Sequence, residues 1–187
     1  GKDLDFSYVA EEGARFRVNL FRKDTGPGAT FRYIPSNIPT LDGLGLPSVV
    51  EKLCDLHQGM VLVTGSTGTG KSTTLAAMID LINKTKAVNI ISLEDPIEFV
   101  HPSKQSQVIQ REVGTHVTSF ADGVRSAMRE DPDVILVGEL RDAETISMAM
   151  TAAETGHLVL GTLHTTGAVK TIDRVIDALP GEMREQT

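Results

Sequence analysis

A glycine-rich stretch, GSTGTGKS at residues 65–72, is the feature that most constrains how this chain can fold. An apolar run typical of a buried strand precedes it, and apolar residues at helical spacing follow it. The stretch matches the P-loop pattern G-x-x-x-x-G-K-[ST], in which backbone N–H groups surround nucleotide phosphates. Lys71 would add positive charge at the β- and γ-phosphates, and the Ser72 hydroxyl would bind Mg²⁺. The sequence therefore predicts a site for ATP and Mg²⁺ formed by Gly65, Ser66, Thr67, Gly68, Thr69, Gly70, Lys71, Ser72 and Thr73.

Strands and helices alternate over the rest of the chain, from residue 48 onward. Strands are expected at residues 60–63, 89–93, 134–137 and 157–163, and helices near residues 49–56, 75–82, 120–128, 146–153 and 169–176. Asp142 is expected to cap the fourth helix, and Pro180 with Gly181 to end the last one. Because these strands are apolar throughout, they predict an α/β fold with a mainly parallel sheet covered by helices on both faces.

The N-terminal region has a different pattern, in which apolar and polar residues alternate. Strands are expected at residues 5–9, 15–20 and 29–34, and together they predict a small antiparallel sheet. Three strands are too few for an independent core, so residues 1–35 are expected to be the end of a larger domain, and the chain to be part of a longer protein. Prolines and glycines in residues 36–47 predict a linker, which leaves residues 48–187 as the main domain.

Composition narrows the class of protein. The single cysteine, Cys54, excludes an internal disulfide and a cysteine-cluster metal site; it is expected to be a small core residue, and a reducing cytoplasm is favoured. No apolar run has the roughly 18 residues of a membrane helix. The net charge of −7 argues against general binding of nucleic acid.

Carboxylates follow two of the expected strands. In IISLEDPIEF, the acids Glu94, Asp95 and Glu98 come just past an apolar strand, and in DVILVGELRD, Glu139 does. Ligands of open parallel sheets bind beyond the carboxyl ends of the strands, where these acids fall. Acids this close repel one another unless a cation or hydrogen-bond donors lie among them. The four acids are therefore candidate catalytic and metal-binding groups.

Two assignments of the acids are open. A common P-loop pattern has Asp-Glu at the second of these strand ends, with the Asp near Mg²⁺, but Gly138 occupies the Asp position. In the first assignment, Glu98 deprotonates the attacking water and Glu139 holds the water shell of Mg²⁺. In the second, Glu139 is the base and one of the other three acids serves the metal. The first is favoured, because without the Asp Glu139 is the nearest carboxylate on its strand.

Two histidines flank the last expected strand. His157 and His164 are seven residues apart, a spacing that puts them on opposite faces of a strand and disfavours one shared metal. His164, at the carboxyl end, is the better candidate for sensing the γ-phosphate. His101 and His116 lie in expected loop or edge segments and carry no functional prediction.

Arginines on the N-terminal strands are the last candidate group. Phosphoryl transfer often uses an arginine supplied by a neighbouring subunit, worth about 10³–10⁵ in rate. A solvated strand face is the alternative explanation. The candidates are Arg15, Arg17, Arg22 and Arg32.

The order of the motifs resembles the type II/IV secretion ATPase superfamily, and in particular its pilus-retraction branch. The motifs are GSTGTGKST, EDPIEF, REDPDVILVGELRD and TGHLVLGTLHTT, with RFRVNLF, FRYIPS and QREVG around them. The similarity covers nearly the whole chain. It implies the end of a PAS-like N-terminal domain, a linker and most of a RecA-like ATPase core. The acid-rich motif is similar to the family's Asp box, GELRD to its Walker B motif and the histidine stretch to its His box.

The resemblance also implies a cytoplasmic motor. Members hydrolyse Mg-ATP in a ring-shaped homo-hexamer at the inner-membrane base of the pilus machine. Their expected partner is the inner-membrane platform protein, with membrane contact only through partners and no direct nucleic acid. Since the N-terminal domain of one subunit sits against the core of the next, Arg15, Arg17 and Arg32 are candidates to reach a neighbour's nucleotide. Hydrolysis would change the angle between the domains and retract the pilus, which powers twitching motility.

Three other functions compete with this one. The first is a pilus-assembly or secretion ATPase of the same superfamily, against which AAETGH favours retraction. The second is a nucleotide-binding ring scaffold without hydrolysis, against which the strand-end acids count. The third is a RecA-like nucleic-acid motor, which the acidic balance and the absence of Trp disfavour.

Overall fold

The computed structural model describes residues 3–11, 13–35, 37–165 and 167–178. It divides into two compact units. The first comprises Gly1–Ile38 and Glu98–Val100, and the second Pro39–Ile97 and His101–Thr187. The division after Ile38 falls within the predicted linker, although Leu41 from that stretch is buried in the core of the second unit.

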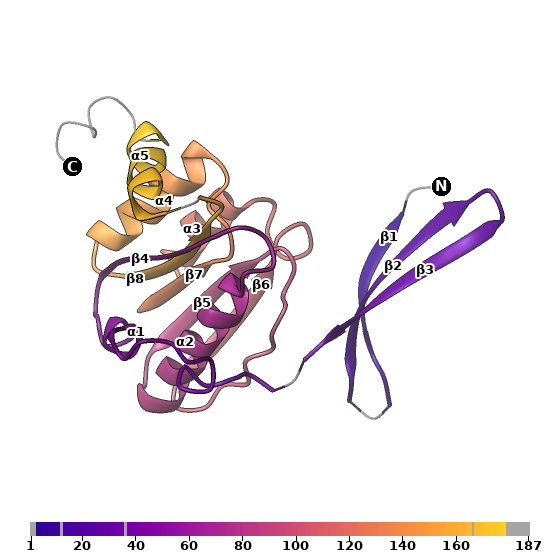
Figure 1. The fold of residues 1–187 in the computed structure, drawn as a ribbon, viewed down its shortest axis with the longest axis horizontal. Coiled ribbons are helices and arrows are strands. Elements are labelled where there is room, and N and C mark those ends of the chain that lie inside the picture. The colour runs from indigo at the N-terminus through magenta and orange to yellow at the C-terminus, as the bar shows by residue number, and fades with distance from the viewer. Residues whose placement is uncertain (1–2, 12, 36, 166, 179–187) are drawn as a thin grey trace. The chain divides into compact units, whose positions relative to one another are not determined.

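The first unit is a three-stranded antiparallel sheet, as the alternating pattern predicts. Its strands are β1 Leu4–Val9, β2 Arg15–Lys23 and β3 Gly26–Ile34 (Figure 1). Phe16 contacts Phe31 and Tyr33 edge to face, with ring centroids 6.4 and 5.7 Å apart. Val18 beside them is buried, but Phe31 is 59% exposed. The sheet therefore buries one apolar residue well and leaves most of its apolar face open to solvent.

The second unit contains a five-stranded parallel sheet, which confirms the predicted α/β class. Its strands are β4 Gly59–Thr64, β5 Asn89–Glu94, β6 Gln107–Glu112, β7 Val134–Val137 and β8 Leu158–Leu163, in the order β4-β8-β7-β5-β6. Only β6 was not anticipated. Its sequence, QVIQRE, has four polar residues of six because it is an edge strand, so it does not show the continuous apolar run of a buried strand.

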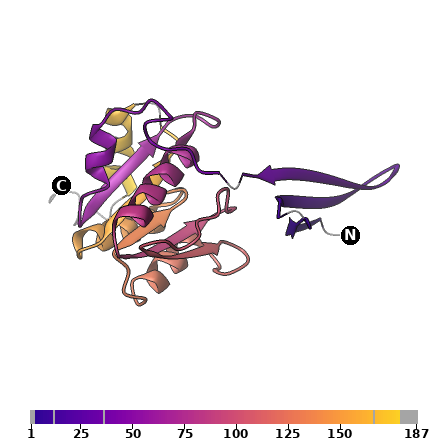
Figure 2. The same ribbon diagram turned by 90° about the horizontal axis from the view of Figure 1, so that it is seen from below.

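Helices cover both faces of this sheet, as predicted (Figures 1 and 2). They are α1 Val49–Leu53, α2 Lys71–Thr85, α3 Phe120–Ala127, α4 Ala143–Glu154 and α5 Ala168–Ala178. The Asp142 side chain accepts a hydrogen bond from the Thr145 N–H, so it caps α4 as expected. The predicted stop at residues 180–181 lies outside the described residues.

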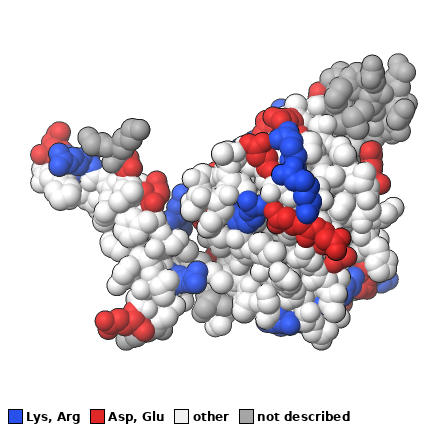
Figure 3. All heavy atoms as spheres, turned by 180° about the vertical axis from the view of Figure 1, so that it is seen from behind, with Lys and Arg blue, Asp and Glu red and all other residues white. Residues whose placement is uncertain are grey.

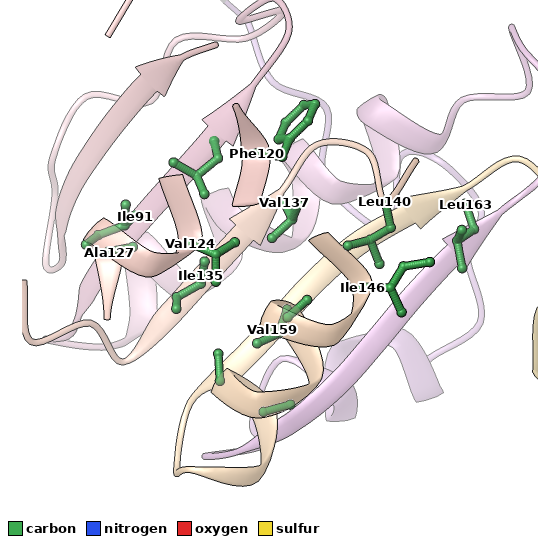
Figure 4. Close-up of a cluster of buried hydrophobic side chains, with 14 residues drawn as sticks. Ile91, Phe120, Val124, Ala127, Ile135, Val137, Leu140, Ile146, Val159 and Leu163 are labelled. Atoms are coloured by element: carbon green, nitrogen blue, oxygen red, sulfur yellow. The ribbon is translucent and has the colours of Figure 1, made fainter. Parts of the chain in front are cut away.

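Two apolar clusters hold the layers together. One packs α3 and α4 against β5, β7 and β8, and Figure 4 shows Phe120 and Val124 of α3 and Ile146 of α4 facing the strand residues. The other packs α1 and α2 against the opposite face, with Ile79 and Ile82 fully buried. Each buried side chain of this size contributes about 1.5–3 kcal/mol through removal from water. The sheet is thus a rigid platform for whatever lies at its ends.

Cys54 belongs to the second cluster and is buried, as predicted. Burial, followed by the negative charge of Asp55, raises the pKa of its thiol to about 11. The thiol therefore stays protonated and unreactive near neutral pH.

No helix within the described part of the chain combines the length and the apolar character needed to cross a membrane. On the face seen in Figure 3, acidic and basic side chains lie close to one another and most of the surface is uncharged.

Candidate functional site

The glycine-rich stretch joins β4 to α2, as the P-loop pattern predicts. Gly65 has a φ of 152°, and a Cβ there would lie 2.7 Å from the Thr69 hydroxyl oxygen. That hydroxyl donates to the Ser66 carbonyl oxygen at 2.8 Å and closes the loop. Gly70 precedes α2 and provides no side-chain cap, so the loop leads directly to the positive end of a helix. Such an end suits an anion such as phosphate.

Lys71 is the first residue of α2, and its side chain binds this loop. It is buried, and its Nζ donates to the carbonyl oxygens of Gly65 (3.0 Å) and Ser66 (2.9 Å). The same Nζ lies 3.5 Å from Nδ1 of His164. The ammonium group therefore links the P-loop to the carboxyl end of β8, the neighbouring strand.

Glu139 is held at the end of β7 by its neighbours on both sides. The Gly138 N–H donates to Leu93 O of β5 at 2.8 Å, and the Leu140 N–H donates to Thr162 O of β8 at 3.0 Å. A Cβ at position 138 would lie only 3.1 Å from Leu93 O. The close approach of β7 to β5 therefore accounts for a glycine where the common pattern has Asp.

A chain of polar contacts runs along the carboxyl edge of the sheet from Lys71. His164 Nε2 lies 3.2 Å from Glu139 Oε1, and Glu139 Oε2 lies 2.7 Å from Arg141 Nε. Arg141 also pairs with Asp95 Oδ2 at 3.8 Å. Nδ1 of His164 faces an ammonium group, from which it can accept, and Nε2 faces a carboxylate, to which it can donate.

The structure thus brings together four predicted site residues: Lys71, His164, Glu139 and Asp95. Glu94 lies at the end of β5, where its Oε1 accepts hydrogen bonds from Ser92 (2.7 Å) and Gln110 (3.0 Å). These bonds place its carboxylate against β6. Glu98 belongs to the first unit with Phe99 and Val100, and its role remains a prediction.

His157 does not join the group. It precedes β8 at the amino edge of the sheet, and its Nδ1 lies 2.9 Å from Ala152 O. Six strand residues lie between it and His164, so the two histidines are seven steps along the chain, or about 23 Å at the usual rise of a strand, apart. Its position is that of a residue that closes the turn between α4 and β8.

The predicted arginines lie in the first unit. Arg17 and Arg32 are register partners on β2 and β3, and Arg15 lies two residues from Arg17 on the same face. This face is opposite the one that carries Phe16 and Val18. Arg22, at the far end of β2, points to the other side.

The donor set suits a magnesium nucleotide rather than a metal bound by protein alone. Ser72 lies exposed in the first turn of α2, and Glu139 supplies a carboxylate at the adjoining sheet edge. In the described ranges, no group of three or more His, Cys, Asp or Glu residues could hold a metal ion. In nucleotide sites, Mg²⁺ takes only one or two protein ligands and completes its octahedron with phosphates and waters. Ser72 and Glu139 fit that role.

A pocket of about 490 Å³ opens beside the Glu139–His164 pair. Its walls come from the ends of β7 and β8 and from α5, which contributes Lys170, Asp173 and Arg174. The Arg174 guanidinium donates to Arg141 O at 3.4 Å, so α5 is tied to the same strand end.

Comparison with known proteins identifies the chain. The model of the type II/IV secretion system protein family matches residues 7–182. The chain belongs to this family.

Two members of this family are similar to the chain over nearly its whole length. A twitching motility protein of Neisseria gonorrhoeae is 58% identical over 183 residues, which are 98% of this chain and 49% of that protein. The type IV pilus retraction ATPase PilT of Pseudomonas aeruginosa is 58% identical over 180 residues, 96% of this chain and 52% of that protein. The chain spans about half the length of these relatives.

A crystal structure of the pilus retraction motor PilT with bound ADP has the same fold. It superposes with a TM-score of 0.94 at 53% identity, over 98% of this chain and 54% of that one. The resemblance to the secretion ATPases stated from the motifs is confirmed, and so is the fold class.

The motifs in the sequence of this chain do not predict the contacts of Arg141 or those of β6. Arg141 follows Glu139 in GELRD, and a guanidinium two residues from a strand-end acid was a usable signal. The side chains of Gln110 and Glu112 contact the segment after β5, but nothing in QVIQRE marks them as special.

Proposed function

We propose that this chain binds Mg-ATP at its P-loop and hydrolyses it. The observation that carries the proposal is the continuous set of contacts from Lys71 through His164 to Glu139 at the carboxyl edge of the sheet. A phosphate chain would be bound by the P-loop residues 65–73 and the positive end of α2. Lys71 would exchange the carbonyl oxygens of Gly65 and Ser66 for phosphate oxygens.

Each polar residue would then have a separate task. Bound Mg²⁺ would neutralise charge on the phosphates, with Ser72 and the water shell held by Glu139 as its protein contacts. Glu98 would take the proton of the attacking water. His164, already between Lys71 and Glu139, would detect loss of the γ-phosphate, because its contact with Lys71 depends on where the ammonium group lies.

The proposal extends to the whole protein. The chain would be part of a motor subunit of a hexameric ring that retracts type IV pili, the activity in the name of the Pseudomonas aeruginosa relative. The three-stranded sheet would be the end of a PAS-like domain, and residues 36–47 the linker between domains. The ring would work in the cytoplasm at the inner-membrane base of the pilus, against a platform protein, and some of Arg15, Arg17 and Arg32 would reach a neighbour's nucleotide. Release of the γ-phosphate would change the angle between the two units.

A phosphate-release assay on the full-length protein tests the enzymatic part. We expect Lys71→Ala to lower turnover to about one-hundredth of the wild type or less, because a cation aimed at developing charge is lost. Exposed Lys84, on the same helix, provides a matched Lys84→Ala control with normal turnover. Wild-type turnover in Lys71→Ala would refute the proposed site. Deletion of the gene tests the retraction part, and normal pilus retraction in the deletion strain would refute it.

A further inference from the structure

The edge strand β6 contacts the segment that carries the acidic residues. β6 runs parallel to β5 with Gln110 opposite Ser92 and Glu112 opposite Glu94. Gln110 and Glu112 therefore point to the same face of the sheet, the face on which Val108 packs toward α2. We call these two side chains the β6 clamp.

Gln110 uses both ends of its amide. Its Nε2 donates to Glu94 Oε1 at 3.0 Å, and its Oε1 accepts from the His101 N–H at 2.8 Å. Glu94 ends β5 and His101 lies seven residues further along the chain. One side chain thus closes the whole segment 94–101 into a loop.

Glu112 holds the middle of the same loop. Its Oε2 accepts from the Ile97 N–H at 3.1 Å, and its Oε1 lies 3.5 Å from the Thr115 hydroxyl. Asn83 of α2 then fixes the chain beyond the loop, because its Nδ2 donates to Pro102 O at 2.8 Å.

We propose that Gln110 and Glu112 are positioning residues for Glu98. The clamp holds the backbone on both sides of residues 98–100, at Ile97 and at His101. Consecutive Cα atoms are about 3.8 Å apart. Glu98 therefore directly follows Ile97, whose backbone N–H is held by Glu112. The inference rests on the proposed function, in which Glu98 is the base that must meet a water beside the nucleotide.

The chemistry of the clamp makes a diagnostic substitution available. Gln110 must donate at one end and accept at the other, which an amide does and an ionised carboxylate does not. Gln110→Glu would keep the shape, lose the donor and set a second negative charge against Glu94. Glu112 only accepts, so Glu112→Gln keeps the needed oxygen whereas Glu112→Ala removes it.

Kinetics of the full-length protein test the proposal. We expect Gln110→Glu and Glu112→Ala to lower kcat about tenfold to a hundredfold with little change in affinity for a fluorescent ADP. Glu112→Gln should recover most of the turnover lost in Glu112→Ala. Gln107→Glu, at the exposed start of β6, is the matched control and should behave as wild type. An unchanged kcat in Gln110→Glu would overturn the proposal, and so would a parallel loss of ADP affinity.

A double variant separates positioning from general damage. If Gln110 acts through Glu98, then Gln110→Glu combined with Glu98→Gln should be no slower than Glu98→Gln alone. Multiplied losses would show that Gln110 acts by another route and would overturn the proposal.

Hydrogen exchange gives a readout that does not need catalysis. The amide of Ile97 should be protected in the wild type and exchange at least tenfold faster in Glu112→Ala. Fast exchange of this amide in the wild type would overturn the clamp even if the enzyme were active. A wild type that does not hydrolyse ATP would instead overturn the proposed function, together with the role of the clamp in it.

Discussion

The five-stranded sheet has an amino edge and a carboxyl edge, where its parallel strands begin and end. Polar residues make different contacts at these two edges. At the amino edge, side chains bind the backbone: Asp133 accepts from the Asn89 N–H, and Asn89 Nδ2 donates to Glu130 O. At the carboxyl edge, charged side chains bind one another, as Glu139 does with His164 and Arg141. Asp133 and Asn89 close turns in this way and cannot leave cheaply, because each would strand a backbone group. Partly exposed side chains bound to one another can exchange partners with a ligand.

The two histidines that flank β8 show the same contrast. His157 faces the Ala152 carbonyl at the amino edge, and His164 faces Lys71 and Glu139 at the carboxyl edge. They lie at the two ends of one strand and in one predicted motif, yet only His164 lies where the proposed chemistry would occur. Position at the two ends of a strand thus gives the two histidines different contacts, and it favours His164 as the functional candidate.

The largest expected effect concerns two of the candidate acids, Glu98 and Glu139. Removal of a general base costs about 10²–10⁴ in rate, so Glu98→Gln should lower kcat by this factor and leave Mg-ATP affinity unchanged. Glu139→Gln should instead weaken Mg-ATP binding, because it disturbs the metal shell. Turnover and titrations of Mg-ATP binding measure both. The reverse pattern would make Glu139 the base.

The next effect concerns His164. Loss of a hydrogen bond to a charged group costs about 1.5–3 kcal/mol, or about 10- to 100-fold. We expect His164→Ala to lower kcat by this factor, measured by phosphate release. A normal kcat would mean that the chain of contacts from Lys71 to Glu139 has no role in turnover.

A pH effect on stability is expected from His101, which sequence analysis set aside. His101 is buried near Asp80 and Lys104, and burial lowers its pKa from 6.5 to about 4. The folded protein therefore binds this proton less readily than the unfolded chain, so stability is full above pH 6.5 and falls as the pH drops toward 4. Between pH 7 and pH 5 the loss should be about 2 kcal/mol.

Urea unfolding at the two pH values measures this loss. His101→Gln, which does not titrate, should show a pH dependence smaller by about the same 2 kcal/mol. An identical dependence in both proteins would show that His101 titrates normally.

The smallest effect is expected at the amino edge. His157→Ala removes the contact with Ala152 O and should lower the free energy of unfolding by about 1 kcal/mol, with kcat unchanged. Thermal melting and the turnover assay measure the two quantities. A tenfold loss of kcat at normal stability would place His157 in the functional group after all and would break the contrast between the edges.

The sequence by itself determined the local parts of this protein. GSTGTGKS predicts its loop because glycines, lysine and hydroxyls at that spacing have one common use. The apolar runs predict a parallel sheet because only strands buried on both faces are apolar at every residue. Asp142 predicts its own cap, since the contact lies within four residues. Local chemistry suffices for each of these.

Only the tertiary structure decided which distant residues meet. The strand order β4-β8-β7-β5-β6 differs from the order in the chain, and it places His164 between Lys71 and Glu139. That order follows from packing α1 and α2 on one face and α3 and α4 on the other, which no short stretch encodes. β6 was missed for the same reason: an edge strand takes its form from the neighbour it pairs with, and its Gln110 and Glu112 gain meaning only from the loop they hold.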